Sequence, residues 1–148
     1  MQILVEIFSN RAIIIPALAW FIAQALKVVS VVIHDRKLDF TRFIGSGGMP
    51  SSHSAFIVSL SAVVGKNLGF DSMEFGMSVA IALIVMYDAA GVRRAAGKHA
   101  KVLNKLTRVI SGQEKMQFDE ELKELLGHTP LEVIMGALLG VIMGLWFG

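Results

Sequence analysis

The stretch GGMPSSHSAFIVSLSAVVGKNL, residues 47–68, joins a polar turn to an apolar helix, and the rest of the chain can be understood around it. Its two glycines let the backbone bend closely, and Pro50 suits the first position of a helix. Ser51, Ser52 and His53 then occupy the first helical turn, where amide N–H groups have no partner inside the helix. Such a turn binds anions. The sequence therefore predicts an anion cradle at the mouth of this helix.

The composition is too apolar for an ordinary soluble domain of this size. Of 148 residues, 54% are hydrophobic and 18% are charged, and the mean hydropathy is +0.62. These values place the chain in a bilayer. The absence of cysteine excludes disulfides and thiolate metal sites. The formal net charge of +2 is modest, and we expect no nucleic acid partner.

Four segments are candidates to cross the membrane, which takes roughly 20 residues of helix. They run at about residues 12–33, 52–68, 73–91 and 130–147. The second is somewhat short and carries small residues on repeated turns, which suits close helix packing in lipid. A cationic amphipathic and then polar helical loop covers about residues 93–127. We expect a single all-α domain over residues 1–148, an integral membrane bundle of about four transmembrane helices with this loop on the cytoplasmic side.

Alternating the direction of these spans brings the candidate polar residues to one side of the membrane. The first span ends there, the second starts there, the third returns there and the fourth starts there. Of the 14 lysines and arginines, only Arg11 and Lys66 fall on the opposite side. By the positive-inside bias the cation-rich side is cytoplasmic. We therefore expect a protein of a bacterial-type cytoplasmic membrane, with its site facing the cytoplasm.

That side gathers the groups needed for phosphoryl transfer without a metal or another cofactor. Such a site needs cations and amides to hold the phosphate oxygens, a nucleophile, and an acid for the leaving oxygen. His53 and His128 suit the last two roles, because histidine titrates near neutrality. The candidates for phosphate binding are Lys27, Arg36, Arg42, Ser51, Ser52, Arg93 and Arg94.

Two of these stretches resemble motifs of the type 2 phosphatidic acid phosphatase superfamily of membrane lipid phosphatases, which also includes the vanadium haloperoxidases. The family's middle motif, Pro-Ser-Gly-His, is similar to PSSH at residues 50–53, with serine in place of glycine. The end of its third motif, a histidine followed by an acid and a glycine-rich helix, is similar to HTPLE at residues 128–132 and the IMGALLG that follows. The chain resembles a divergent, minimal member of this superfamily.

The resemblance implies a metal-free phosphatase that acts on a phosphorylated lipid. By it, His128 is the nucleophile that forms a phosphohistidine, Glu132 orients its ring in place of the usual aspartate, and His53 is the general acid. A cytoplasmic site suits a lipid phosphate made on the inner leaflet, such as phosphatidylglycerophosphate. An undecaprenyl phosphate or diphosphate is the next candidate. A homodimer would bury the small-residue helix faces.

The chain departs from the family pattern around its cations. The first motif has arginine-proline seven residues after its lysine, whereas His34 stands at that distance from Lys27. The third motif has an arginine six residues before its histidine, where this chain has Leu122. Which arginine binds the phosphate therefore stays an open question. A non-catalytic membrane protein that binds lipid phosphates is the alternative function.

Structural explanations compete with several of these roles. Thr129 to Glu132 fits a capping box, so Glu132 can serve to cap its helix. Lys27 can snorkel to the interface from the end of its span. Asp88 is expected to pair with Arg93 or Arg94 and neutralise charge near the membrane. A competing alignment pairs Arg93 with His99, but it lacks the acid and the glycine-rich helix.

Overall fold

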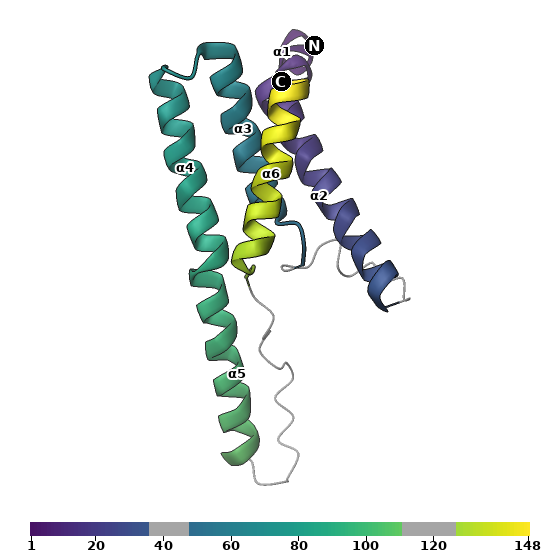
Figure 1. Cartoon of the computed structure of the whole chain (residues 1–148), viewed down its shortest axis with the longest axis vertical. Coiled ribbons are helices and arrows are strands. Elements are labelled where there is room, and N and C mark those ends of the chain that lie inside the picture. The colour runs from purple at the N-terminus through teal and green to yellow at the C-terminus, as the bar shows by residue number, and fades with distance from the viewer. Residues whose placement is uncertain (36–47, 111–126) are drawn as a thin grey trace.

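The computed structural model describes residues 1–35, 48–110 and 127–148, and these form a bundle of helices (Figure 1). No strand occurs within these ranges, so the all-α class is confirmed. Both termini lie at one end of the bundle, and α5 continues α4 away from the other end (Figure 1). The helices are α1 (Gln2–Ser9), α2 (Arg11–Asp35), α3 (Ser52–Leu68), α4 (Met73–Ala90), α5 (Val92–Ile110) and α6 (Pro130–Phe147).

Within the part of the chain that the structure describes, three helical stretches are long and apolar enough to cross a membrane. They are Arg11–Ser30, Met73–Thr107 and Pro130–Phe147. Helix α3 has 17 residues, fewer than the roughly 20 of a full span, and it packs against α2, α4 and α6. The segment expected as the second span is therefore the central helix of the bundle. The total of four spans stays a prediction.

The bundle has small residues inside and large apolar residues outside, which is the arrangement expected in lipid. Ala19, Ala23 and Ala55 are fully buried. By contrast, Ile84 is 69% exposed and Trp146 is 80% exposed. Because large apolar side chains cover the outside of these long apolar helices, this surface lies in a membrane.

Helices α3 and α6 touch almost backbone to backbone. Gly136, Gly140 and Gly144 recur every fourth residue on α6 and are all buried. A Cβ atom at Gly140 would lie 2.7 Å from the carbonyl oxygen of Ala55, and one at Gly144 would lie 2.5 Å from the Cβ of Ala62. These small-residue faces bury each other within one chain. They therefore give no argument for the homodimer that was expected to cover them.

Helix α3 begins later than the position of Pro50 suggests. Ser51 is the N-cap, and its hydroxyl accepts a hydrogen bond from the Ser54 N–H at 3.4 Å. Pro50 therefore precedes the cap, and the Met49–Pro50 peptide bond is cis. The prediction of Pro50 as the first helical residue is wrong, because a serine cap satisfies an amide that a proline start would leave open. Ser52 and His53 do occupy the first turn.

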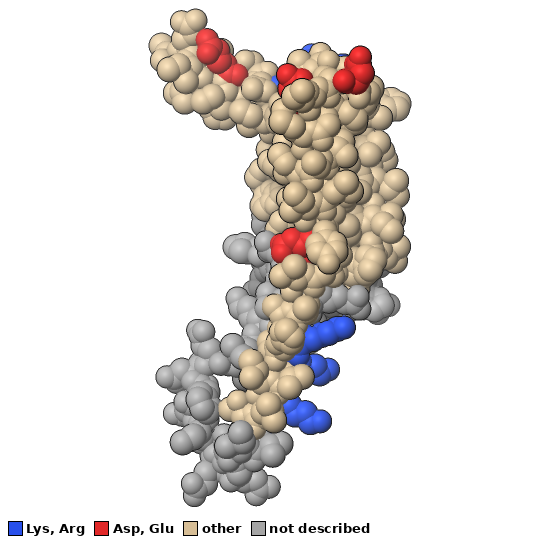
Figure 2. Space-filling model, turned by 90° about the vertical axis from the view of Figure 1, so that its left-hand side faces the viewer, with Lys and Arg blue, Asp and Glu red and all other residues tan. Residues whose placement is uncertain are grey.

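Cationic side chains are segregated toward the two ends of the molecule. Lys98, Lys101 and Lys105 are exposed on α5, where Figure 2 shows basic side chains projecting beyond the bundle. At the opposite end, Arg11 donates to the carbonyl oxygen of Gly148 at 3.3 Å, and Lys66 donates to that of Leu145 at 3.0 Å. Both of these cations meet the carbonyl end of α6, where the helix dipole favours positive charge.

The substitution Gly140→Ala should lower the free energy of unfolding by about 1–3 kcal/mol, because the added methyl group forces α3 and α6 apart. Thermal unfolding of the purified protein in detergent measures this effect. Gly76 on α4 provides the matched control, since nothing lies within 4 Å of a Cβ built there. Gly76→Ala should leave the melting temperature unchanged or slightly raised. A Gly140→Ala variant that melts with the wild type would contradict the close packing.

Candidate active site

The starts of α3 and α6 and the end of α4 meet at one end of the bundle. The Ser51 N–H donates to the carbonyl oxygen of Glu132 at 2.9 Å, and the His128 N–H donates to that of Ala89 at 2.9 Å. These two backbone hydrogen bonds join segments that are distant in the sequence. The predicted convergence of the polar segments on one side is therefore seen for the part of the chain that the structure describes.

His128 is buried against Glu132. Its exposed fraction is 2%, and its Nδ1 lies 3.1 Å from Oε2 of Glu132. The same oxygen accepts a hydrogen bond from the Thr129 N–H at 3.1 Å, while the Glu132 N–H donates to Oγ1 of Thr129 at 3.3 Å. Glu132 thus completes the predicted capping box and contacts the imidazole as well. With Nδ1–H donating to a carboxylate, the lone pair of a neutral imidazole is at Nε2.

His53 is the neighbour of His128 across the helix interface. The two ring centroids are 6.0 Å apart and the ring planes are inclined by 62°. His53 is half-buried at the start of α3, so its position depends on the contact between α3 and α6. A carboxylate and two imidazoles, those of Glu132, His128 and His53, are therefore successive neighbours.

Lys27 supplies a buried ammonium beside the start of α3. It is 4% exposed, and its Nζ donates to Oγ of Ser52 at 3.2 Å. Gly48, at φ +86°, crosses over the stem of this lysine, where a Cβ would lie 3.9 Å from Lys27 Cγ. The lysine does not snorkel to the surface. A buried ammonium beside a helix N-terminus favours an anion.

Ser51 has a different place from the one expected for a phosphate ligand. Its N–H is bonded to the carbonyl oxygen of Glu132, and its hydroxyl accepts from the Ser54 N–H. Its amide therefore joins two helix starts and is not available to an anion. The sequence around Ser51 does not predict this hydrogen bond, because its acceptor, the carbonyl oxygen of Glu132, lies on α6.

The candidate arginines fall outside what the structure describes. Arg36 and Arg42 lie in residues 36–47, and for Arg93 and Arg94 only the helical backbone of α5 is described. The pairing predicted for Asp88 depends on the same two α5 side chains. The choice of the phosphate-gripping arginine stays a prediction.

His99 and His128, the histidines of the two competing alignments, differ in environment. His99 is exposed on α5, whereas His128 is buried beside His53. The described residues contain no group of three or more His, Asp or Glu side chains placed to hold a metal ion.

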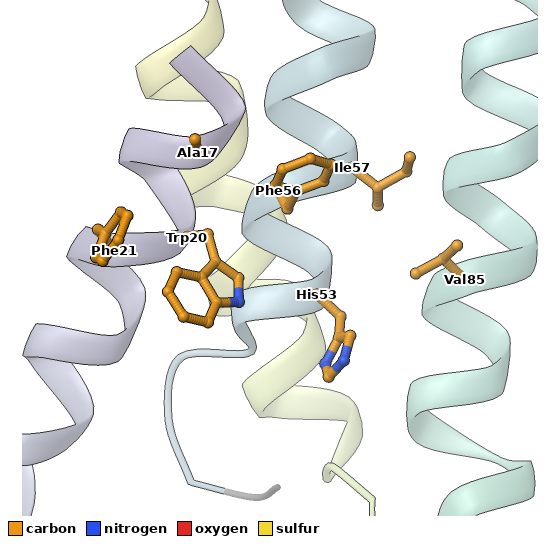
Figure 3. Close-up of a pocket in the computed structure, with 7 residues that line it drawn as sticks. All are labelled: Ala17, Trp20, Phe21, His53, Phe56, Ile57 and Val85. Carbon is orange, nitrogen blue, oxygen red and sulfur yellow. The ribbon is translucent and has the colours of Figure 1, made fainter. Parts of the chain in front are cut away.

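A cavity of about 490 Å³ beside His53 has no counterpart in the sequence interpretation. Figure 3 shows its residues coming from α2, α3 and α4, with His53 at its lower end. The apolar and aromatic residues of the spans were visible in the sequence, but the faces that they share depend on helix packing. The cavity is lined by Ala17, Trp20, Phe21, His53, Phe56, Ile57 and Val85.

Comparison with known proteins identifies the family. A family model described as "Divergent PAP2 family" matches residues 8–143. The chain is also 40% identical over 150 residues, covering 95% of both chains, to a protein of Bacillus subtilis (strain 168) named "Uncharacterized membrane protein YuiD". No solved structure matches the chain. Because the family match includes most of the chain and every site residue described above, the chain belongs to the Divergent PAP2 family.

Proposed function

We propose that the protein is a membrane lipid phosphate phosphatase that works through a phosphohistidine on His128. The observation that carries the proposal is the buried Glu132–His128 contact with His53 beside it. Membership of the Divergent PAP2 family suggests phosphatase activity at a coarse level. The buried Lys27 ammonium, held by Ser52 at the start of α3, adds a place for the phosphate.

In the first step, Nε2 of neutral His128 attacks phosphorus. The Nε2–P bond forms and the bond from phosphorus to the leaving oxygen breaks, while protonated His53 gives its proton to that oxygen. Glu132 accepts the Nδ1–H hydrogen bond and stabilises the positive charge that develops on the ring, as the acid of a catalytic triad does. Its capping bonds to Thr129 hold the carboxylate in place for this role.

In the second step, His53 acts as a base. It takes a proton from a water molecule whose oxygen attacks the phosphohistidine, and the Nε2–P bond breaks. Inorganic phosphate leaves, and both histidines return to their starting states. One histidine can serve in both steps because an imidazole can give and take a proton near neutral pH.

The phosphate oxygens would be held by Lys27 and by the amides of the first turn of α3. Ser52 contributes there, and its hydroxyl already accepts from the Lys27 ammonium. One of Arg36, Arg42, Arg93 and Arg94 completes the charge in this scheme. The Ser51 amide positions the helix start through its bond to Glu132, which leaves the hydroxyl of Ser51 as its candidate donor to the phosphate.

The charge distribution supports a site facing the cytoplasm of a bacterial-type membrane. The exposed lysines of α5 lie beyond the end of the bundle at which α6 begins (Figure 1), and the positive-inside bias makes that side cytoplasmic. A lipid phosphate of the inner leaflet is then the substrate. Phosphatidylglycerophosphate is the first compound to test, and an undecaprenyl phosphate or diphosphate is the second.

Purified protein should release phosphate from a lipid phosphate in the presence of a chelator. His128→Ala should lower kcat by about 10³-fold or more, because the nucleophile is lost. His53→Ala should lower it by about 10²–10⁴-fold, as expected for loss of a general acid. His99→Ala, which changes an exposed histidine on α5, is the control and should match the wild type.

Two results would count against this scheme. Retained activity in His128→Ala would exclude His128 as the nucleophile. A wild-type protein that turns over no lipid phosphate, while still binding one, would favour the non-catalytic alternative.

Glu132 should fix the tautomer of His128. In ¹⁵N NMR spectra of histidine-labelled protein, His128 should carry its proton on Nδ1, and Glu132→Ala should shift the population toward Nε2–H. Thr129→Ala is the matched control, since it removes the capping hydroxyl, at a cost of about 1 kcal/mol, and leaves the carboxylate. The signal is assigned by its loss in His128→Ala. An unchanged tautomer in Glu132→Ala would show that the acid only caps the helix.

The orientation of the site can be tested in a chain that has no cysteine of its own. Asn67→Cys and Lys101→Cys place single thiols at exposed positions near opposite ends of the molecule. A membrane-impermeant thiol reagent added to intact cells should label the Asn67 variant, and it should label the Lys101 variant only after permeabilisation. The reverse pattern would place His128 on the outer side.

A further inference from the structure

The cavity lined by Trp20, Phe56 and Val85, named here the Phe56 cavity, extends from the candidate site into the bundle. His53 lies at its lower end, and Phe56 and Ile57 lie about one turn further along α3, toward the middle of the membrane (Figure 3). Val85 of α4 faces them, and Trp20 of α2 lies on the other side. The cavity is thus continuous with the site through His53.

We propose that the Phe56 cavity binds a single hydrocarbon chain bonded directly to the leaving oxygen of the substrate. The substrate class is then an alkyl or prenyl phosphate. Of the two candidates named above, the undecaprenyl compound fits this class, and phosphatidylglycerophosphate, whose leaving alcohol is a polar glycerol lipid, does not. This inference rests on the proposed function, because it takes His53 as the group that protonates the leaving oxygen.

The position of His53 determines what must enter the cavity. A proton donor lies within hydrogen-bond reach of the atom that it protonates, so the substituent on the leaving oxygen lies beside His53. Beyond His53 the wall consists of aliphatic and aromatic side chains. A glycerol hydroxyl placed there would lose its water without gaining a hydrogen bond, which is unfavourable, whereas methylene groups would lose nothing.

The size of the cavity fits one chain. A dry cavity of about 150 Å³ holds one benzene ring. By that measure the volume of about 490 Å³ holds a chain on the order of 15–20 carbons. Trp20 and Phe21 meet edge to face, with their ring centroids 5.0 Å apart, and form an aromatic wall of the cavity. The cavity is open along one side, where Phe21 and Phe56 are partly exposed, so a longer chain can extend out of it.

Steady-state kinetics in mixed micelles test the cavity with farnesyl phosphate and with para-nitrophenyl phosphate, which has no chain. Val85→Phe should lower kcat/KM for farnesyl phosphate by at least about tenfold more than for para-nitrophenyl phosphate, because the larger ring fills the chain site. Ala17→Phe, from a different helix, should do the same. Ile84→Phe is the control: Ile84 is 69% exposed on the same helix, and its change should leave both substrates within about twofold.

The wild type should also prefer farnesyl phosphate to phosphatidylglycerophosphate in kcat/KM. Two results would overturn the chain site. One is an equal loss of kcat/KM for farnesyl phosphate and para-nitrophenyl phosphate in Val85→Phe and Ala17→Phe. The other is a preference of the wild type for phosphatidylglycerophosphate. A wild type that hydrolyses neither substrate would instead count against the proposed function.

A binding measurement tests the cavity without catalysis. The chain has two tryptophans, so Trp146→Phe leaves Trp20 as the only one. In vesicles, an alkyl phosphonate brominated on its chain, which has no cleavable P–O–C bond, should quench Trp20 more strongly than the brominated alcohol at the same mole fraction. Lys27→Met should remove that difference. Equal quenching by phosphonate and alcohol would mean that ordinary bilayer chains fill the cavity, and would overturn the proposal even if the protein is a phosphatase.

Discussion

The contact between α3 and α6 is the constraint on which the candidate site depends. Gly136 faces the carbonyl group of Ser51, with which any Cβ would collide, and this close approach accompanies the hydrogen bond from the Ser51 N–H to Glu132. Since α3 carries His53 and α6 carries Glu132, the spacing of the two helices sets the spacing of the catalytic candidates. The glycines of α6 thus help to set the positions of the polar side chains at the end of the bundle.

Local sequence patterns predicted the parts of the site that lie within one helical turn. The spacing of Thr129 and Glu132 predicted the capping box, and the spacing of His128 and Glu132 put both on one face of a helix start. The approach of His53 to His128 required more, namely the alternation of the spans and the resemblance to a known family. The structure shows the predicted contact of Glu132 with His128 and the approach of His53 to His128, while the chemical roles of these residues stay predictions.

Features that depend on contacts between helices could not be predicted from spacing. Lys27 lies near the end of a span, where snorkelling is common, yet the turn at Gly48 and the hydroxyl of Ser52 enclose it. The Ser51 N–H is bonded to the carbonyl oxygen of Glu132, a partner on α6 that the spacing of residues within α3 does not predict. The Phe56 cavity likewise exists only through the angles at which α2, α3 and α4 pack. Periodicity gives the faces of each helix but not which faces meet.

One oxygen atom, Oε2 of Glu132, holds both the backbone of Thr129 and the ring of His128. A change at this position would therefore affect the start of the helix and the candidate site together. An aspartate would shorten the side chain by one methylene group and favour one of the two partners over the other. The length of the Glu132 side chain is thus a shared requirement of the helix start and of the candidate site.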